Sequence, residues 1–250
     1  MAFAFAVVQE QKSLDLCPYV DPGVREEVGA ELDVQQRAGE HLKPDLAEDA
    51  LAWARQRATS MRPADLADRI GGTLVGAGED ALLEFSYFTG TVRLGPEGLS
   101  RPDGGPLSHW EQVLIYNHLA QGGSAEPTGR WLGLVDIPNT SSKQKSMQAH
   151  VETPLAERFA GRRDALLEAA RAQGGVEVPD QAETADLAVR FQPLPRVPVL
   201  LAFWDHDPQE GFEARVKLLF DATVTDHLDI ESIMFLSETL RDRLLDAGPG

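Results

Sequence analysis

The 250-residue chain is poor in cysteine, in lysine and in aromatic side chains, and it contains no long apolar run. Its single cysteine, Cys17, cannot form an internal disulfide, a four-thiolate zinc site or the ligand set of an iron–sulfur cluster. No stretch reaches the roughly 20 apolar residues that a membrane-spanning helix needs. The apolar residues 1–8 lack a basic flank and so do not fit a secretory signal. We therefore expect a cytoplasmic protein.

Acidic side chains dominate the charge of the chain. Forty aspartates and glutamates against 23 lysines and arginines give a formal net charge of -17. Such a surface repels phosphate backbones and anionic lipid headgroups over more than a Debye length. We therefore expect neither nucleic acid nor a membrane as partner, but another protein or a small molecule. A hydrophobic content of 42% is sufficient for one sizeable core.

The hydrophobic pattern predicts an α+β fold with a mostly antiparallel sheet, built from two hairpins and covered by helices. Residues 85–94 alternate around Thr89-Gly90, which predicts the first hairpin. The apolar run 199–204 predicts a strand buried on both faces, paired with the alternating residues 214–220 across an acidic loop. Prolines 193, 195 and 198 are expected to interrupt the ladder, because proline has no N–H to donate.

Helix signals divide the chain into residues 1–62, a helical N-terminal region packed on the main domain, and residues 63–250, the α+β domain. The first region has helix starts at Asp21-Pro22 and Asp45. In the main domain a short helix is expected to stop at Gly71-Gly72.

The best-defined helix begins with the capping box Ser108–Glu111 and ends at Gly122-Gly123. The polar segment 139–149 predicts a mobile loop, after which a helix restarts at Thr153-Pro154 and continues to Gly174. Asp229 is expected to cap a final helix that packs on the sheet.

Four carboxylates near the second hairpin form the candidate metal site. Asp205, Asp207 and Glu210 lie in the acidic loop, and Asp221 ends the partner strand, so we expect them at one edge of the hairpin. Oxygen ligands in this number suit Ca²⁺ or Mg²⁺, and His206 extends the choice to Zn²⁺ or Mn²⁺. The alternative is a solvated loop in which Asp207 begins a turn and Asp221 makes local hydrogen bonds.

Three further side chains are candidates for ligand binding. Trp204 ends the buried run, and its indole N–H needs a partner that a ligand could provide. Trp131 is a candidate for the same reason, and packing is the alternative for both. His118 lies on the helix that starts at Ser108, where a core or surface histidine is the alternative to a ligand contact. No nucleophile elbow or two-histidine helical metal motif is present, so no catalytic residue is predicted.

Several short motifs indicate a family by their order and spacing: Leu66–Gly71, Thr128–Trp131, Pro193–Pro198, Phe203-Trp204 and Leu219–Asp221. In these motifs the chain, from about Ala64 to Leu244, resembles the DUF3786 family, a domain of unknown function found largely in anaerobic bacteria and archaea. The resemblance implies no reaction, because the function of the family is unassigned. Some relatives are joined to a four-cysteine iron–sulfur domain, which this chain does not contain.

Three functions are compatible with these observations. We expect a non-catalytic binding or accessory protein of unknown ligand, which serves a cofactor-bearing enzyme in anaerobic metabolism. The alternative is a metal-dependent enzyme that uses the acidic loop. The resemblance also implies handling of a corrinoid or another tetrapyrrole, with His118, His150 or His206 as axial ligand. The spacing of the residues selects no cofactor.

Overall fold

The computed structural model describes residues 48, 51–78, 81–182, 184–206 and 211–248. It divides into the units Met1–Ala50 and Leu51–Gly250, and the helix starts predicted at Asp21 and Asp45 lie outside the described residues. In the second unit, residues 51–59 are helical. The elements that follow are α3 (Pro63–Ile70), β1 (Thr73–Val75), β2 (Leu82–Tyr87), β3 (Gly90–Gly95), β4 (Gly98–Ser100), α4 (His109–Gln121), β5 (Trp131–Gly133), η3 (Leu134–Asp136), α5 (Gln144–Met147), η4 (Gln148–Glu152), α6 (Thr153–Phe159), α7 (Arg163–Ala172), β6 (Val176–Glu177), η5 (Pro179–Gln181), β7 (Leu187–Leu194), β8 (Val197–Trp204), β9 (Arg215–Asp221), α8 (Val224–His227) and α9 (Ile230–Ala247).

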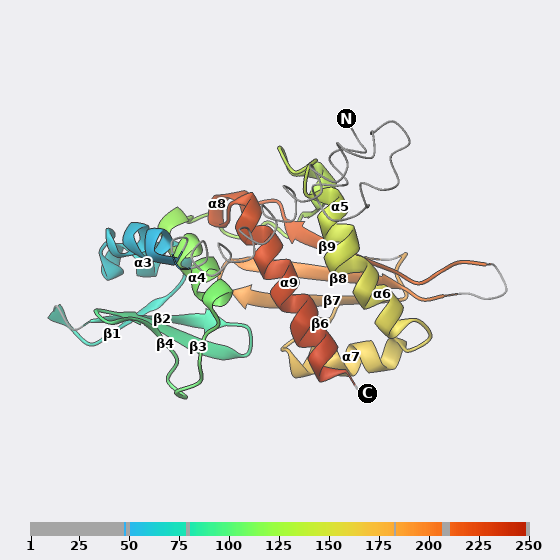
Figure 1. Ribbon diagram of the computed structural model, residues 1–250, viewed down its shortest axis with the longest axis horizontal. Helices are drawn as coiled ribbons and strands as arrows, with labels where there is room; N and C mark the ends of the chain where they lie inside the picture. Colours follow the sequence, from blue (N-terminus) through green and yellow to red (C-terminus); the bar gives the residue numbers. More distant parts are fainter. Residues whose placement is uncertain (1–47, 49–50, 79–80, 183, 207–210, 249–250) are drawn as a thin grey trace, which may run out of the picture. The chain divides into compact units, whose positions relative to one another are not determined.

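Two antiparallel sheets confirm the α+β fold class. One has the strand order β1-β2-β3-β4 and the other the order β5-β9-β8-β7-β6. The predicted hairpins are β2–β3 and β8–β9, and every residue from Val197 to Phe203 is buried. Figure 1 shows α6, α7 and α9 on one face of the five-stranded sheet. Within the described ranges, no helix combines the length and the hydrophobicity needed to cross a bilayer.

The predicted helix ends are confirmed by their hydrogen bonds. The Glu111 N–H donates to Ser108 Oγ at 3.2 Å, and the Ser108 N–H donates to Glu111 Oε2 at 3.0 Å, which completes the capping box of α4. Asp229 Oδ1 accepts from the Ser232 N–H at 2.7 Å at the start of α9. Gly71 closes α3 with a φ of 76°, a conformation that glycine adopts at little cost.

The proline-rich run interrupts the regular ladder, as expected, but it does so inside a further hairpin, which was not predicted. Leu194 pairs with Val197, so Pro195 and Arg196 form the turn between β7 and β8. A register shift between Phe191 and Leu194 accommodates the missing N–H groups. Proline retains its carbonyl, and the Pro193 oxygen accepts from the Phe88 N–H at 2.9 Å, which links β7 to the turn after β2.

The loop expected at 139–149 is mostly helical. Helix α5 passes directly into the π-helical turn η4 and then into α6. Met147, Val151 and Leu155 follow one another at four-residue spacing and are buried, so their burial outweighs the polar composition of the segment. Pro154 cannot donate to a preceding carbonyl, but the Arg241 guanidinium donates to the His150 carbonyl.

The helix predicted from Thr153 to Gly174 is divided in two. Gly161 has a φ of 70° and lies in the connection between α6 and α7. A side chain at this position would be strained, and a Cβ atom would approach the His206 ring to 3.0 Å. The Gly161 N–H donates to Asp205 Oδ1 at 2.6 Å. The break therefore brings the α6–α7 connection against the end of β8.

Candidate functional site

The predicted metal ligands Asp205 and Asp221 lie at opposite ends of the β8–β9 hairpin. Asp205 follows β8 directly, and Trp204 pairs with Arg215 at the start of β9. Asp221 is the last residue of β9. Extended chain advances about 3.3 Å per residue, so Asp221 lies about 20 Å along β9 from Arg215. This corrects the expectation of a shared edge: the second strand of a hairpin runs away from the loop that precedes it.

Asp221 instead holds two backbone segments in place. Its carboxylate accepts from the N–H and the hydroxyl of Thr128, from the N–H of Gly129 at 2.6 Å, and from the N–H and the hydroxyl of Thr223. Burial opposes its ionisation, but these hydrogen bonds outweigh burial and lower the pKa of Asp221. Trp131, half-buried on β5, pairs directly with Asp221. The motif around Trp131 is therefore fixed by Asp221.

The remaining acidic-loop residues are only partly described. Asp205 Oδ1 accepts from the backbone N–H groups of Gly161 and His206, at 2.6 and 2.7 Å. Asp207 and Glu210 lie outside the described residues. In the part of the chain that the structure describes, no group of three or more His, Cys, Asp or Glu side chains is arranged to hold a metal ion. A site formed by Asp205, Asp207 and Glu210 stays a prediction.

Trp204 lines a hollow of about 480 Å³ beside the same loop. The Arg215 guanidinium lies 4.3 Å from the centre of its ring, a cation–π contact. Phe212, with 65% of its surface exposed, and Asp186 also line this hollow. The face of Trp204 is thus already occupied by Arg215, which favours the packing alternative for this side chain.

His118 is enclosed in the core together with His227. Both side chains have no exposed surface, and their ring centres lie 6.0 Å apart. His118 Nδ1 lies 3.3 Å from the His227 carbonyl oxygen, and His227 Nε2 lies 2.9 Å from the Ala125 carbonyl oxygen. Because a carbonyl only accepts, each of these ring nitrogens carries the proton. Burial lowers the pKa of His118 to about 4, so the ring is neutral at neutral pH.

A cavity of about 580 Å³ between α4 and α9 combines more ligand-binding features than any of the predicted positions. Its volume lies within the range of about 300–1,000 Å³ that is typical of small-molecule sites. The start of α4 and one face of α9 line it: Ser108, Trp110, Glu111, Phe235, Glu238, Thr239, Asp242, Arg243 and Asp246. We call it the α4–α9 cavity.

Two aromatic rings form one wall of the α4–α9 cavity. The ring centres of Trp110 and Phe235 lie 5.0 Å apart, with the planes inclined by 31°. Trp110 nevertheless keeps 47% of its surface exposed. A large exposed aromatic side chain beside a hollow is typical of ligand or partner contacts, because its burial contributes much free energy.

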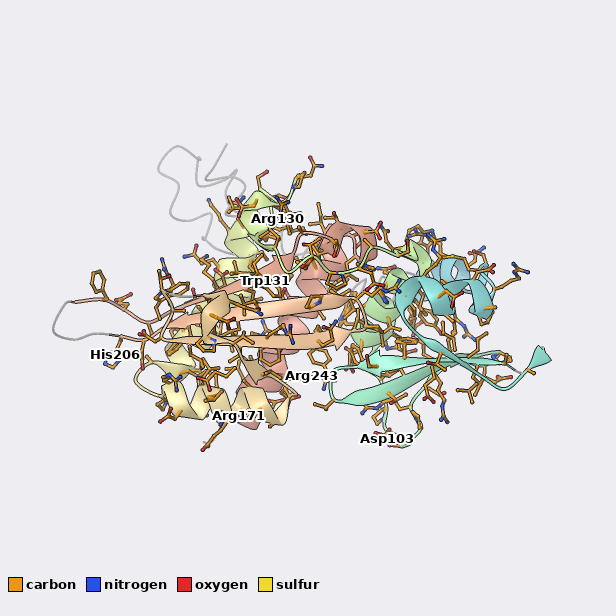
Figure 2. All side chains as sticks on the ribbon, turned by 180° about the vertical axis from the view of Figure 1, so that it is seen from behind. Asp103, Arg130, Trp131, Arg171, His206 and Arg243 are labelled. Carbon is orange, nitrogen blue, oxygen red and sulfur yellow. The ribbon has the colours of Figure 1, made fainter. Side chains whose placement is uncertain are left out.

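An ion pair lines the α4–α9 cavity, and two aromatic side chains lie beside its arginine. Arg243 donates to Glu111 Oε1 at 2.8 Å, and its guanidinium lies 4.3 Å from the ring centre of Phe88 and 5.4 Å from that of Tyr87. Figure 2 shows Arg243 beside the junction of the two sheets. The Tyr87 side chain is buried beside this pair and is not part of the cavity lining, and its hydroxyl interacts with Glu111 and Arg243. The polar groups that a ligand can reach here are therefore those of Glu111 and Arg243.

Tyr87 and Glu111, beside this cavity, each keep one protonation state at neutral pH. Burial raises the pKa of the Tyr87 hydroxyl, and the nearby Glu111 carboxylate raises it further. Burial opposes ionisation of Glu111, but hydrogen bonds from Ser108 and Arg243 outweigh it and lower its pKa. Tyr87 therefore stays protonated and Glu111 stays ionised. These groups are suited to recognition rather than to proton transfer, which requires a pKa near the operating pH.

Three carboxylates follow one another along the face of α9 that lines the cavity. Glu238, Asp242 and Asp246 stand at four-residue spacing, so their Cα atoms are separated by about 6 Å along the helix axis. Asp242 pairs with Arg241 at 2.6 Å. Among the residues that the structure describes, neither Glu238 nor Asp246 has an ion-pair partner. The α9 face therefore has uncompensated negative charge.

Sequence reasoning missed this cavity. The sequence predicts Glu111 as part of a helix cap, and nothing close to Trp110 or Arg243 in the sequence indicates a cavity. The partners of these residues lie 125 and 132 positions away in the sequence, in Phe235 and Arg243. The one available signal was Trp110 at the first turn of a capped helix, where a side chain is often exposed.

Comparison with known proteins agrees with these motifs. No curated protein and no solved structure matches the chain. The family described as domain of unknown function DUF3786 matches residues 62–243, more than half of the chain, and this range includes Tyr87, Trp110, Glu111 and Arg243. On this match the chain belongs to the DUF3786 family.

Proposed function

We propose that this protein is a non-catalytic binding protein and that its ligand occupies the α4–α9 cavity. The observation that carries the proposal is the half-exposed Trp110 ring beside Phe235 in a cavity of about 580 Å³. The ion pair of Arg243 with Glu111 adds polar groups on the cavity lining that can orient a ligand. The fixed charges beside the cavity favour binding over acid–base catalysis.

Saturation-transfer NMR with a mixture of small cationic, anionic and neutral compounds tests this proposal. We expect at least one compound to receive magnetisation from the wild-type protein and to lose that signal in a Trp110→Ala variant. Truncation of this ring removes about half of the aromatic wall and leaves the core intact, because the ring lies at the surface.

A Trp53→Ala variant is the matched control, because Trp53 is also a helical and largely exposed tryptophan, with 57% of its surface accessible. Its spectra should equal those of the wild type. If every compound that binds still binds to Trp110→Ala, or if none binds to the wild type, the α4–α9 cavity is not the ligand site.

The other functions predicted from the sequence are tested independently. An accessory role beside a cofactor-bearing enzyme predicts co-purification with that enzyme from the native host. A metal-dependent enzyme predicts metal in elemental analysis, now through Asp205, Asp207 and Glu210 without Asp221. Tetrapyrrole handling predicts visible absorption, with His150 or His206 as exposed candidates and His118 as an enclosed one. No described contact favours one of these over ligand binding in the α4–α9 cavity.

A further inference from the structure

The charges around the α4–α9 cavity indicate the chemical class of its ligand. Four carboxylates and one guanidinium line the cavity, and the guanidinium of Arg243 is already paired with Glu111. An anionic ligand would meet Glu238 and Asp246, which have no positive partner in the described part of the chain. A cation would be attracted by the same two groups, and the net charge of -17 extends this attraction into solution.

The aromatic wall supports the same class. Trp110 and Phe235 stand next to Glu238 on the cavity lining, and the faces of tryptophan and phenylalanine attract ammonium groups. Elsewhere in this chain the accessible face of Trp204 is covered by Arg215 and that of Trp53 by Arg57, whereas no cation–π contact of Trp110 occurs among the described residues. An exposed ring bordered by carboxylates thus lacks the cation that comparable rings have.

The spacing along α9 adds a constraint on shape. Glu238, Asp242 and Asp246 follow one another on α9, and their Cα atoms are about 6 Å apart along the helix axis. Asp242 already pairs with Arg241, so the free carboxylates are Glu238 and Asp246, about 12 Å apart along the helix axis. A linear chain with ammonium groups at its two ends, separated by methylene linkers, matches this distance. The methylene linkers can pack on Trp110 and Phe235, as the stems of long basic side chains do.

We propose that the α4–α9 cavity binds a linear aliphatic polyamine, with ammonium groups at Glu238 and Asp246 and one end against Trp110. The inference rests on the proposed function, because it names the ligand class of that site.

Isothermal titration calorimetry of the full chain with spermidine tests the inference, with uncharged 1,8-octanediol as the control of similar length. We expect saturable binding of spermidine and none of the diol. Glu238→Gln and Asp246→Asn should each weaken spermidine binding about three- to fivefold, as expected for partly exposed charge pairs. Trp110→Ala should weaken it by a similar factor.

A Glu157→Gln variant separates specific binding from general attraction to an acidic protein. Glu157 is exposed on α6 and away from the cavity lining, and its substitution removes the same charge. It should leave spermidine affinity unchanged. If Glu157→Gln weakens binding as much as Glu238→Gln, the attraction is diffuse and the inference is overturned. If compounds that depend on Trp110 prove to be anionic or uncharged, the polyamine assignment fails and the proposed cavity stands. If no compound depends on Trp110, both fail.

Discussion

An Asp221→Asn variant is expected to lose about 3 kcal/mol of unfolding free energy, because a buried acceptor of charge-assisted hydrogen bonds is replaced by an amide. The wild-type carboxylate accepts hydrogen bonds from three backbone N–H groups and two hydroxyl groups, which belong to Thr128, Gly129 and Thr223. The asparagine amide has one oxygen, and its NH₂ group would face these donors. Urea denaturation followed by circular dichroism measures the loss.

Asp226→Asn is the matched control for this prediction. Asp226 is an exposed carboxylate that accepts from the backbone N–H groups of Ser124 and Ala125, at 2.8 and 2.9 Å. Solvent can replace these partners, so the control should lose less than about 1 kcal/mol. Equal losses in the two variants would show that burial of Asp221 contributes nothing. Metal content that falls in Asp221→Asn while stability is retained would restore the predicted ligand role.

The second large effect concerns pH. Between pH 6.5 and about 4, His118 takes up a proton in the unfolded chain but not in the folded one, because burial lowers its folded pKa to about 4. The unfolded state therefore binds more protons, and stability falls as pH falls, by about 1.4 kcal/mol per unit. We expect the unfolding free energy to fall by about 3 kcal/mol in total across this window. Above the window, ionisation of His118 should not contribute to the pH dependence.

Unfolding free energies measured by urea titration from pH 7.5 to 4 check this expectation. The slope against pH, rather than the stability itself, is the readout, since His118→Gln also changes core packing. The slope should flatten in His118→Gln and persist in His150→Gln, whose side chain is exposed. The carboxylates with lowered pKa, Asp221 and Glu111, contribute stability that is present above their unfolded pKa values of about 4 and is lost as pH falls through their folded pKa values. This loss begins at the acidic end of the window in both histidine variants, so the difference between their slopes reports His118. An unchanged slope in His118→Gln would contradict the buried neutral ring.

Local signals were sufficient for much of the fold. The capping box of Ser108 and Glu111, the cap at Asp229 and the alternation on either side of Thr89 involve residues close in sequence, so their physical cause is contained in a short window. Even there the observed turn differs from the predicted Thr89-Gly90 by one residue. Tyr87 pairs with Gly90, so Phe88 and Thr89 form the turn.

Predictions from short sequence windows failed where residues distant in the sequence supply the packing contacts and hydrogen-bond donors of a segment. Prolines 193 and 195 predicted an interruption of the ladder but not the hairpin around it, in which a bulge and the distant Phe88 N–H accommodate them. The polar segment 139–149 suggested a loop, but Met147 becomes buried in tertiary packing and Arg241 binds a carbonyl freed by proline. In each case tertiary structure overrides propensity.

The candidate site could not be predicted for the same reason. The predicted carboxylates were expected at one edge of the β8–β9 hairpin, yet the length of strand β9 separates Asp205 from Asp221. The α4–α9 cavity depends on pairs such as Glu111 with Arg243, which only the folded chain brings together. Residue type alone identified Trp131 and Trp204, but it could not distinguish a ring covered by an arginine from one left open.

Phe88 has a consequence for the order in which this protein is made. Its backbone lies in the left-handed region, with a φ of 49°, a conformation that costs a bulky residue about 1–3 kcal/mol. The contacts that offset this cost come from Pro193 and Arg243, which a ribosome adds 105 and 155 residues later. Both contacts are therefore absent when the segment of β2 and β3 leaves the ribosome. Truncation of α9 would remove Arg243, so a change near the C-terminus is expected to destabilise the turn between β2 and β3.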